Sequence, residues 1–134
     1  MATVSVIIPT YNRAEFLHSA INSVLNQTYQ DFEIIVVDDA STDNTYDVVG
    51  SFKDERIRYV RHETNKKIAT ARNTGVATSQ GKYVAFLDDD DEWLPEKLQR
   101  QVDLLESSPP VVGGVYTGFL EIDRVTGKML VRIV

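Results

Sequence analysis

Five consecutive acidic residues, Asp88 to Glu92, follow the apolar stretch VAFL at residues 84–87. Like charges this close repel one another, so the cluster is unfavourable unless a cation or solvent compensates it. Asp88 and Asp90 have the Asp-x-Asp spacing of side chains that bind Mg²⁺ or Mn²⁺ through oxygen atoms. One or two carboxylates commonly share such a cation with substrate phosphates. The cluster therefore predicts a divalent-metal site that bridges an acidic rim to an anionic substrate.

The same cluster has two other interpretations. An EF-hand calcium loop needs glycine at its sixth position and glutamate at its twelfth, where this chain has Trp93 and Gln99. That interpretation is rejected. A solvated turn at the start of the following helix stays open, because acidic residues are favourable at helix N-termini. It accounts for one or two aspartates better than for five acids.

Strands and helices alternate along the chain around this cluster. Short apolar, β-branched runs predict strands at Val4–Ile8, Phe32–Val37, Arg56–Arg61 and Tyr83–Leu87. Helical spacing of apolar residues and helix-start signals predict two helices that end near Asn26 and Phe52, and a third over Lys67–Thr78. A fourth helix is predicted with Pro95 in its first turn. This order predicts an α/β fold with a Rossmann-like, mostly parallel sheet and helices on both faces.

Two local patterns refine this outline. Asn12 and Glu15 have the spacing of a capping box for the first helix. After the fourth helix, Val111–Asp123 predicts a further strand, and the turn sequence Val125–Lys128 predicts a turn into a last strand, Met129–Val134.

Polar residues stand where three of the predicted strands end. Pro9 to Asn12 follow the first strand, Asp38 and Asp39 the second, and Asp88 to Asp91 the fourth. Parallel strands end at one edge of a sheet, and ligands bind there, near a switch in strand order. These residues are therefore expected to meet in one crevice.

Each candidate side chain has a functional and a structural interpretation. Asp39 is suited to accept a hydrogen bond from a nucleobase ring N–H, or to cap the loop before the second helix. Tyr11 is suited to stack on a base, or to cover the rim. Arg72 is suited to contact a phosphate or a rim carboxylate, or to be a surface arginine. His18 and His62 lack a metal-ligand partner at recognisable spacing, and both are expected on the surface.

Composition narrows the function classes. The 134 residues are 43% hydrophobic, which suits one globular domain with a core. With 14 basic and 20 acidic residues the net charge is −6, which excludes a general nucleic-acid binder. The absence of cysteine excludes disulfides and a thiol nucleophile, and fits a reducing compartment. No apolar run approaches the ~18–20 residues of a membrane span, so we expect a cytoplasmic location, with membrane association of a longer protein open.

The combined motifs resemble those of family 2 glycosyltransferases. The matching segments are PTYN at 9–12, QTYQDFE at 27–33, VDDASTD at 37–43, ARNTG at 71–75 and FLDDDDEWLP at 86–95. The resemblance spans about Val4 to Leu105. It implies a GT-A-type fold and a transferase that depends on a nucleotide sugar.

The resemblance also implies roles at the nucleotide. Pro9 and Tyr11 would lie at the nucleotide sugar, with Tyr11 packed at the base. Asp39 would contact the base, and Arg72 would lie at the nucleotide site. Many family members have a glycine-rich turn before the ARN motif, where this chain has Asn65–Ile68. The backbone is therefore expected to approach the ligand less closely there, or the lysines to add positive charge for phosphates.

For the acidic cluster, the resemblance implies that Asp90 ligates Mn²⁺ or Mg²⁺ on the diphosphate, with Asp88 a second candidate ligand. Asp88 and Asp89 would lie near the ribose and sugar, in an order that the sequence leaves open. Asp91 fits the family's second acid, toward the acceptor.

The implied activity is transfer of a sugar from a nucleoside-diphosphate sugar, by family habit a UDP-sugar, to a hydroxyl of a saccharide or lipid-linked acceptor, with inversion. Family members usually have a second half that carries the acceptor site and the general base. Residues 1–134 are therefore expected to be a single donor-binding domain of a longer enzyme, which binds nucleotide and metal but transfers little or no sugar.

Two other function classes stay open. One is a non-catalytic nucleotide-binding or assembly module with the same fold. The other is a receiver-like signalling domain, although a receiver's aspartate pair follows its first strand, whereas Asp38 and Asp39 follow the second. An unpaired sheet edge near the end of the chain would also favour self-association.

Overall fold

The computed structural model describes residues 2–123 and 125–132, which divide into two compact units, Met1–Leu98 and Gln99–Val134. Strands and helices alternate in the first unit, as predicted. Its elements are β1 (Val4–Thr10), α1 (Ala14–Leu25), β2 (Phe32–Asp38), α2 (Thr45–Ser51), β3 (Ile57–Arg61), α3 (Lys67–Thr78) and β4 (Tyr83–Phe86). Helix α4 (Lys97–Ser107) continues into the second unit, which holds β5 (Phe119–Ile122) and β6 (Met129–Arg132).

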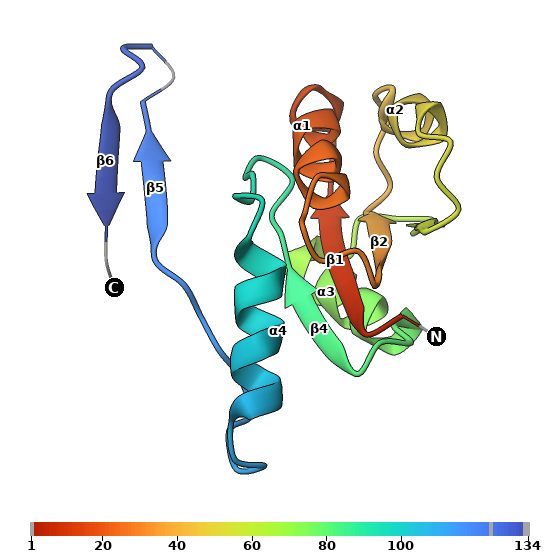
Figure 1. The fold of residues 1–134 in the computed structure, drawn as a ribbon. Coiled ribbons are helices and arrows are strands. Elements are labelled where there is room, and N and C mark those ends of the chain that lie inside the picture. The colour runs from red at the N-terminus through yellow and green to blue at the C-terminus, as the bar shows by residue number, and fades with distance from the viewer. Residues whose placement is uncertain (1, 124, 133–134) are drawn as a thin grey trace. The chain divides into compact units, whose positions relative to one another are not determined.

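The four strands of the first unit form a parallel sheet in the order β3-β2-β1-β4. β1 therefore lies between β2 and β4 (Figure 1). The chain moves outward from β1 to β2 and β3, then crosses to the other side of β1 to form β4. This change of direction is the switch point at which open parallel sheets bind ligands. The predicted α/β fold with a parallel sheet flanked by helices is confirmed.

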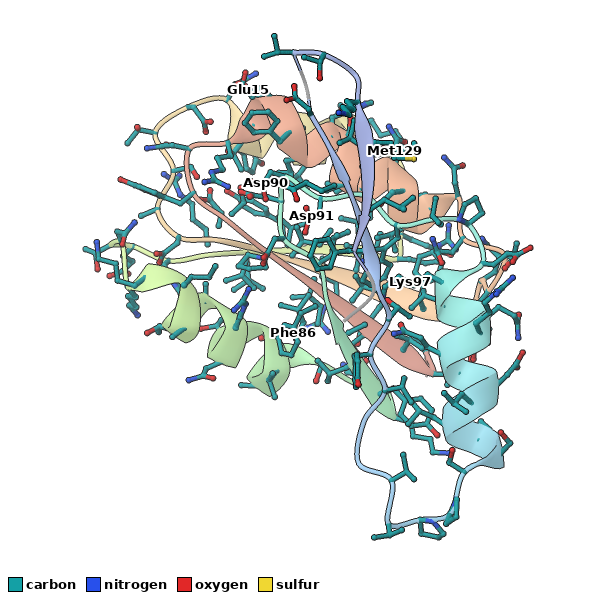
Figure 2. All side chains as sticks on the ribbon, turned by 90° about the vertical axis from the view of Figure 1, so that its left-hand side faces the viewer. Glu15, Phe86, Asp90, Asp91, Lys97 and Met129 are labelled. Carbon is teal, nitrogen blue, oxygen red and sulfur yellow. The ribbon has the colours of Figure 1, made fainter. Side chains whose placement is uncertain are left out.

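Both faces of the sheet are covered, because every residue of β1 and β2 is buried. Helices α1 and α3 lie on opposite sides of β1 (Figure 2). Ala71 of α3 packs in a cluster with Ile7, Ile35 and Val37. A Cβ atom on Gly75 would lie only 2.3 Å from Ile7 Cγ2, so glycine permits the close contact between α3 and β1. This contact fixes the helix that carries Arg72.

The predicted capping box at the start of α1 is wrong. Asn12 has a positive φ of 52°, and its Oδ1 accepts a hydrogen bond from the Thr42 backbone N–H at 2.7 Å. Asp43 Oδ2 instead accepts the Ala14 N–H of α1 at 3.0 Å, and its Oδ1 accepts the Thr45 N–H of α2 at 3.1 Å. Asp43 thus serves the first turns of both helices.

The second unit contains an antiparallel hairpin of β5 and β6. Its turn is closed by Asp123 Oδ1, which accepts hydrogen bonds from the N–H groups of Val125 and Thr126. The predicted turn is confirmed, but the predicted strand Val111–Asp123 is too long, since only Phe119–Ile122 is a strand. Three glycines, which are unfavourable in strands, lie before Phe119. Residues 133 and 134 of the predicted last strand lie outside the described residues.

None of the helices described for this chain combines the length and the apolar character needed to cross a membrane.

Candidate functional site at the carboxyl edge of the sheet

Hydrogen bonds join the loops that follow β1, β2 and β4. The Asp39 N–H donates to the Thr10 carbonyl at 2.9 Å, and the Asn12 N–H donates to Ser41 Oγ at 2.9 Å. The Thr10 hydroxyl donates to Asp89 Oδ2 at 2.8 Å across 79 positions of sequence. The predicted convergence of the three loops at one edge of the sheet is confirmed.

Asp39 is buried and almost saturated with hydrogen bonds. Its Oδ1 lies 2.8 Å from the Lys66 backbone nitrogen and 2.7 Å from His62 Nδ1, and its Oδ2 accepts the Lys67 N–H at 2.8 Å. Burial opposes ionisation, but the hydrogen bonds from Lys66, His62 and Lys67 outweigh it and lower the pKa of Asp39. A carboxylate has about four acceptor positions. The position left over is therefore on Oδ2.

His62 is buried, which contradicts its predicted place on the surface. Its Nδ1 faces ionised Asp39, which can only accept, so Nδ1 carries the proton. Its Nε2 lies 2.9 Å from Thr74 Oγ1 on α3. His62 thus connects the ends of β2 and β3 to α3. The sequence carries no signal for this role, because both partners are more than a helical turn away along the chain. His18 is exposed, as predicted.

The loop before α3 places two backbone N–H groups on Asp39 by adopting a strained conformation. Lys67 has a positive φ of 71°, a region that costs a non-glycine residue about 1–2 kcal/mol. The resemblance implies a glycine-rich turn at this position, where this chain has Lys66 and Lys67. The glycine-like backbone is retained at Lys67, and the side chains of Lys66 and Lys67 are exposed beside the edge.

The acidic cluster after β4 is held by two arginines. Arg72 Nη2 donates to Asp88 Oδ1 at 2.6 Å. Arg13 Nη1 lies 3.3 Å from Asp89 Oδ1 and 2.9 Å from Asp90 Oδ2. The side chains of Asp88 and Asp90 are 45% and 43% exposed, whereas that of Asp89 is 7% exposed. Two carboxylates of the cluster are therefore open to a ligand, and one is part of the protein interior.

The pKa values of Asp89 and of the neighbouring Arg13 are both raised. Burial raises the pKa of the Asp89 carboxyl, and the hydrogen bond from Thr10 and the charge of Arg13 only partly offset it. The carboxylates of Asp89 and Asp90 raise the pKa of the Arg13 guanidinium. These neighbouring carboxylates therefore favour the charged form of Arg13.

Arg72 contacts one rim carboxylate, as one of its predicted interpretations required. Its guanidinium carbon lies 5.9 Å from the centre of the Phe86 ring. Its Nε is buried and has no hydrogen-bond partner among the described residues. Figure 2 shows Asp90 and Asp91 on the α1 side of β4, with Phe86 on the side of α3. Arg72 thus pairs with Asp88 through Nη2 and keeps a buried Nε–H without a partner among the described residues.

The remaining predicted residues occupy distinct places. Tyr11 is 46% exposed in the loop after β1, so its ring is available for stacking. Pro9 is buried inside β1, where it pairs in register with Val37 of β2. Asp91 is exposed, and its N–H donates to the Asp88 carbonyl at 3.1 Å.

The loop after the acidic cluster is fastened to the end of α1. Gln27 Nε2 donates to the Leu94 carbonyl at 2.8 Å, and Gln27 Oε1 accepts the Leu98 N–H at 2.9 Å. The Thr28 N–H donates to the Pro95 carbonyl at 2.8 Å. The paired motif residues Gln27 and Thr28 therefore help to position the acidic loop.

A divalent metal fits this donor set if a ligand shares it. Within residues 2–123 and 125–132, no three acidic or histidine side chains are arranged to enclose a metal ion. Mg²⁺ and Mn²⁺ commonly use one or two carboxylates and complete their shell with phosphates and water. Asp90 and Asp88 supply half-exposed oxygen atoms of this kind. Both oxygens already attract a cation, since each lies against a guanidinium.

Comparison with known proteins decides the family. A family model described as Glycosyl transferase family 2 matches residues 5–131. The chain belongs to this family. The receiver-domain alternative is thereby excluded, and the predicted family is confirmed.

Three proteins similar to this glycosyltransferase chain are each more than twice as long as the segment that matches it. The Escherichia coli UDP-Glc:alpha-D-GlcNAc-diphosphoundecaprenol beta-1,3-glucosyltransferase WfaP is 40% identical over 107 residues, which cover 80% of this chain and 43% of WfaP. Staphylococcus aureus TarS 1–349, solved with UDP-GlcNAc, is 32% identical with a TM-score of 0.74, over 79% of this chain and 31% of the TarS 1–349 chain. The mannosyltransferase PcManGT of Pyrobaculum calidifontis, solved with GDP-Man and Mn²⁺, is 31% identical with a TM-score of 0.76, over 83% of this chain and 34% of the PcManGT chain.

This glycosyltransferase chain thus spans less than half the length of each of these proteins. The likeness to solved transferases confirms the predicted GT-A-type fold.

Proposed function

We propose that the carboxyl edge of this sheet binds a nucleoside-diphosphate sugar, most simply a UDP-sugar, together with Mn²⁺ or Mg²⁺. The observation that carries the proposal is the pairing of half-exposed Asp88 and Asp90 with two arginines, beside Tyr11 and Asp39. An acidic edge that already holds cations is suited to a ligand that brings both a metal and an anion.

The nucleotide end of the proposed ligand lies between Tyr11 and Asp39. The exposed ring of Tyr11 offers a stacking surface, and Asp39 Oδ2 offers one acceptor position for a base N–H. The guanidinium of Arg72, whose side chain is 40% exposed, offers N–H donors for a phosphate oxygen. TarS with UDP-GlcNAc and PcManGT with GDP-Man support a nucleotide sugar as the ligand class.

The metal end lies at Asp90, with Asp88 beside it. A bound divalent ion supplies Lewis-acid stabilisation of the negative charge that develops on the departing diphosphate. Asp89 has a structural role, since it is buried and holds Arg13 and Thr10 in place. The Mn²⁺ in PcManGT supports metal use.

The reaction that we propose for the whole protein is a single displacement. An acceptor hydroxyl attacks the anomeric carbon, the bond to the diphosphate breaks, and the configuration inverts. A carboxylate base takes the hydroxyl proton; we assign that role to none of the residues described. The name of WfaP supports a lipid-linked saccharide as one class of acceptor.

Calorimetric titration with UDP, GDP, ADP and TDP, with and without Mn²⁺, tests this proposal. We expect binding that needs Mn²⁺ in the parent chain and that Asp90→Ala abolishes. Asp54→Ala is the matched control, because Asp54 is also an arginine-paired aspartate but precedes β3 at the opposite edge of the sheet. Binding that is independent of Mn²⁺, or that persists in Asp90→Ala, overturns the proposal.

A further inference from the structure

Arg13 places a guanidinium group on Asp90. It belongs to the loop that follows β1, immediately before the first residue of α1. Its Nη1 lies between Asp89 Oδ1 at 3.3 Å and Asp90 Oδ2 at 2.9 Å. No local pattern singles out this arginine, because its two partners lie 76 and 77 positions away along the chain.

The two contacts of Arg13 differ in how easily they break. The Asp89 side chain is 7% exposed and also accepts the Thr10 hydroxyl, so its carboxylate is fixed in place. The side chains of Asp90 and Arg13 are 43% and 50% exposed. Ion pairs between such exposed groups are weak and are screened by salt. Asp89 therefore anchors the guanidinium near the cluster, while its contact with Asp90 is easily exchanged.

Arg13 and a divalent metal compete for Asp90. Both need the same carboxylate, and two positive charges at this separation repel each other. A diphosphate removes the conflict, since its oxygens can accept from the guanidinium and ligate the metal together. Arg13 then exchanges its contact with Asp90 for a contact with phosphate, while its contact with Asp89 keeps the guanidinium nearby.

We propose that Arg13 occupies Asp90 until the donor binds and then passes to the diphosphate, so that metal binding depends on the nucleotide. Arg13 is in this sense a positioning residue that keeps the metal site closed to free cations. The inference rests on the proposed nucleotide and metal site.

The test compares Arg13→Gln with the parent chain in two measurements. Mn²⁺ binding without nucleotide, followed by electron paramagnetic resonance, is expected to become roughly two- to fivefold tighter, as release of one exposed ion pair implies. UDP binding at saturating Mn²⁺, followed by calorimetry, is expected to become about tenfold weaker, as loss of one charge-assisted hydrogen bond implies. These changes have opposite signs, which a merely structural role does not produce.

Two further variants keep the test decisive. Arg56→Gln removes the same charge from the ion pair between Arg56 and Asp54, which lies at the opposite edge of the sheet. The affinities for Mn²⁺ and for UDP should both stay at the parent values. Arg13→Lys keeps the charge but has a single ammonium group, and it should fall between Arg13→Gln and the parent chain in both measurements. It also serves if Arg13→Gln does not fold, as judged by circular dichroism.

The outcomes separate the inference from the proposed function. If the parent chain binds no nucleotide in the presence of Mn²⁺, the proposed function fails and the inference fails with it. If the parent chain binds UDP and Mn²⁺ together, but both Arg13 variants bind Mn²⁺ alone no more tightly than the parent, the inference alone is overturned.

Discussion

Two aspartate clusters at one edge of the sheet are built in opposite ways. After β2, Asp38 and Asp39 are 1% and 3% exposed, and their close partners are backbone N–H groups and the side chains of His62 and Tyr59. The half-exposed guanidinium of Arg61 lies farther away, 3.7 Å from Asp38 Oδ2. After β4, Asp88 and Asp90 are half exposed, and their partners are arginines whose side chains are also half exposed. Backbone partners cannot leave without unfolding a loop, whereas guanidinium groups can exchange with a ligand. The first cluster shapes the site, and the second is free to change partners.

Tyr59 illustrates the first kind of cluster. Its hydroxyl donates to Asp38 Oδ2, and burial, together with the nearby charge of Asp38, raises the pKa of Tyr59. Asp38 Oδ1 accepts the Ser41 N–H at 2.7 Å. Asp38 therefore holds the loop in which Asp39 is presented and has a structural role.

The largest effect on folding is expected for Asp39→Ala. This change leaves one buried and two partly buried donors without an acceptor, and an unsatisfied buried donor costs about 1–3 kcal/mol. We expect the free energy of unfolding, measured by urea denaturation, to fall by about 3–5 kcal/mol. Asp39→Asn keeps one acceptor oxygen and should lose less. An unchanged urea midpoint in Asp39→Ala would show that the cluster after β2 does not shape the loops.

A smaller loss is expected for His62→Phe, which keeps a ring but removes both ring nitrogens. Asp39 loses one buried hydrogen bond and Thr74 loses its partner, so the free energy of unfolding should fall by about 1–3 kcal/mol. Thr74→Val removes only the contact between Thr74 and His62, so the free energy of unfolding of this variant should fall less. Equal losses in both variants would mean that the bond between His62 and Asp39 contributes nothing.

Lys67→Gly is expected to stabilise the protein by about 1 kcal/mol, because glycine adopts a positive φ without the cost that lysine has. Lys66→Gly is the matched control, since Lys66 has a φ of −107° and gains no such relief. Thermal denaturation of the two variants should give melting temperatures that move in opposite directions. A lower melting temperature for Lys67→Gly contradicts the strain that we assign to this loop.

Asp90→Ala should change the free energy of unfolding by less than about 1 kcal/mol, because the ion pair that it removes with Arg13 is exposed. The same variant should lose the Mn²⁺-dependent part of nucleotide binding. Urea denaturation and calorimetry on one sample measure both quantities. Large destabilisation of Asp90→Ala would remove the contrast between the two clusters.

The pH dependence of stability isolates the charge of Asp39. Its pKa is lower in the folded protein than in the unfolded chain, so its ionisation stabilises the folded state above the ordinary carboxyl range near pH 4. That contribution is lost as the pH falls through the folded-state pKa. The difference in unfolding free energy between the parent chain and Asp39→Asn should therefore shrink between pH 6 and pH 3. A constant difference means that the hydrogen bonds, and not the charge, account for the effect.

The sequence by itself determined the fold class and the edge at which the site lies. Apolar periodicity is a local property, so β1, β2 and β4 and the polar residues after them are visible along the chain. Parallel connections then bring Tyr11, Asp39 and Asp88 to one edge without further information. The resemblance to family 2 glycosyltransferases rested on the same short segments.

Only the tertiary structure decided which of these carboxylates are nearly saturated with hydrogen bonds and which are open to a ligand. Asp39 and Asp90 look alike in sequence, since each belongs to a run of aspartates after a strand. Their partners His62 and Arg13 lie 23 and 77 positions away, and no local period relates such distances. Hydrogen bonds and burial depend on contacts between distant segments. For that reason the burial of His62, the strain at Lys67 and the arginine on Asp90 emerged only from the folded chain.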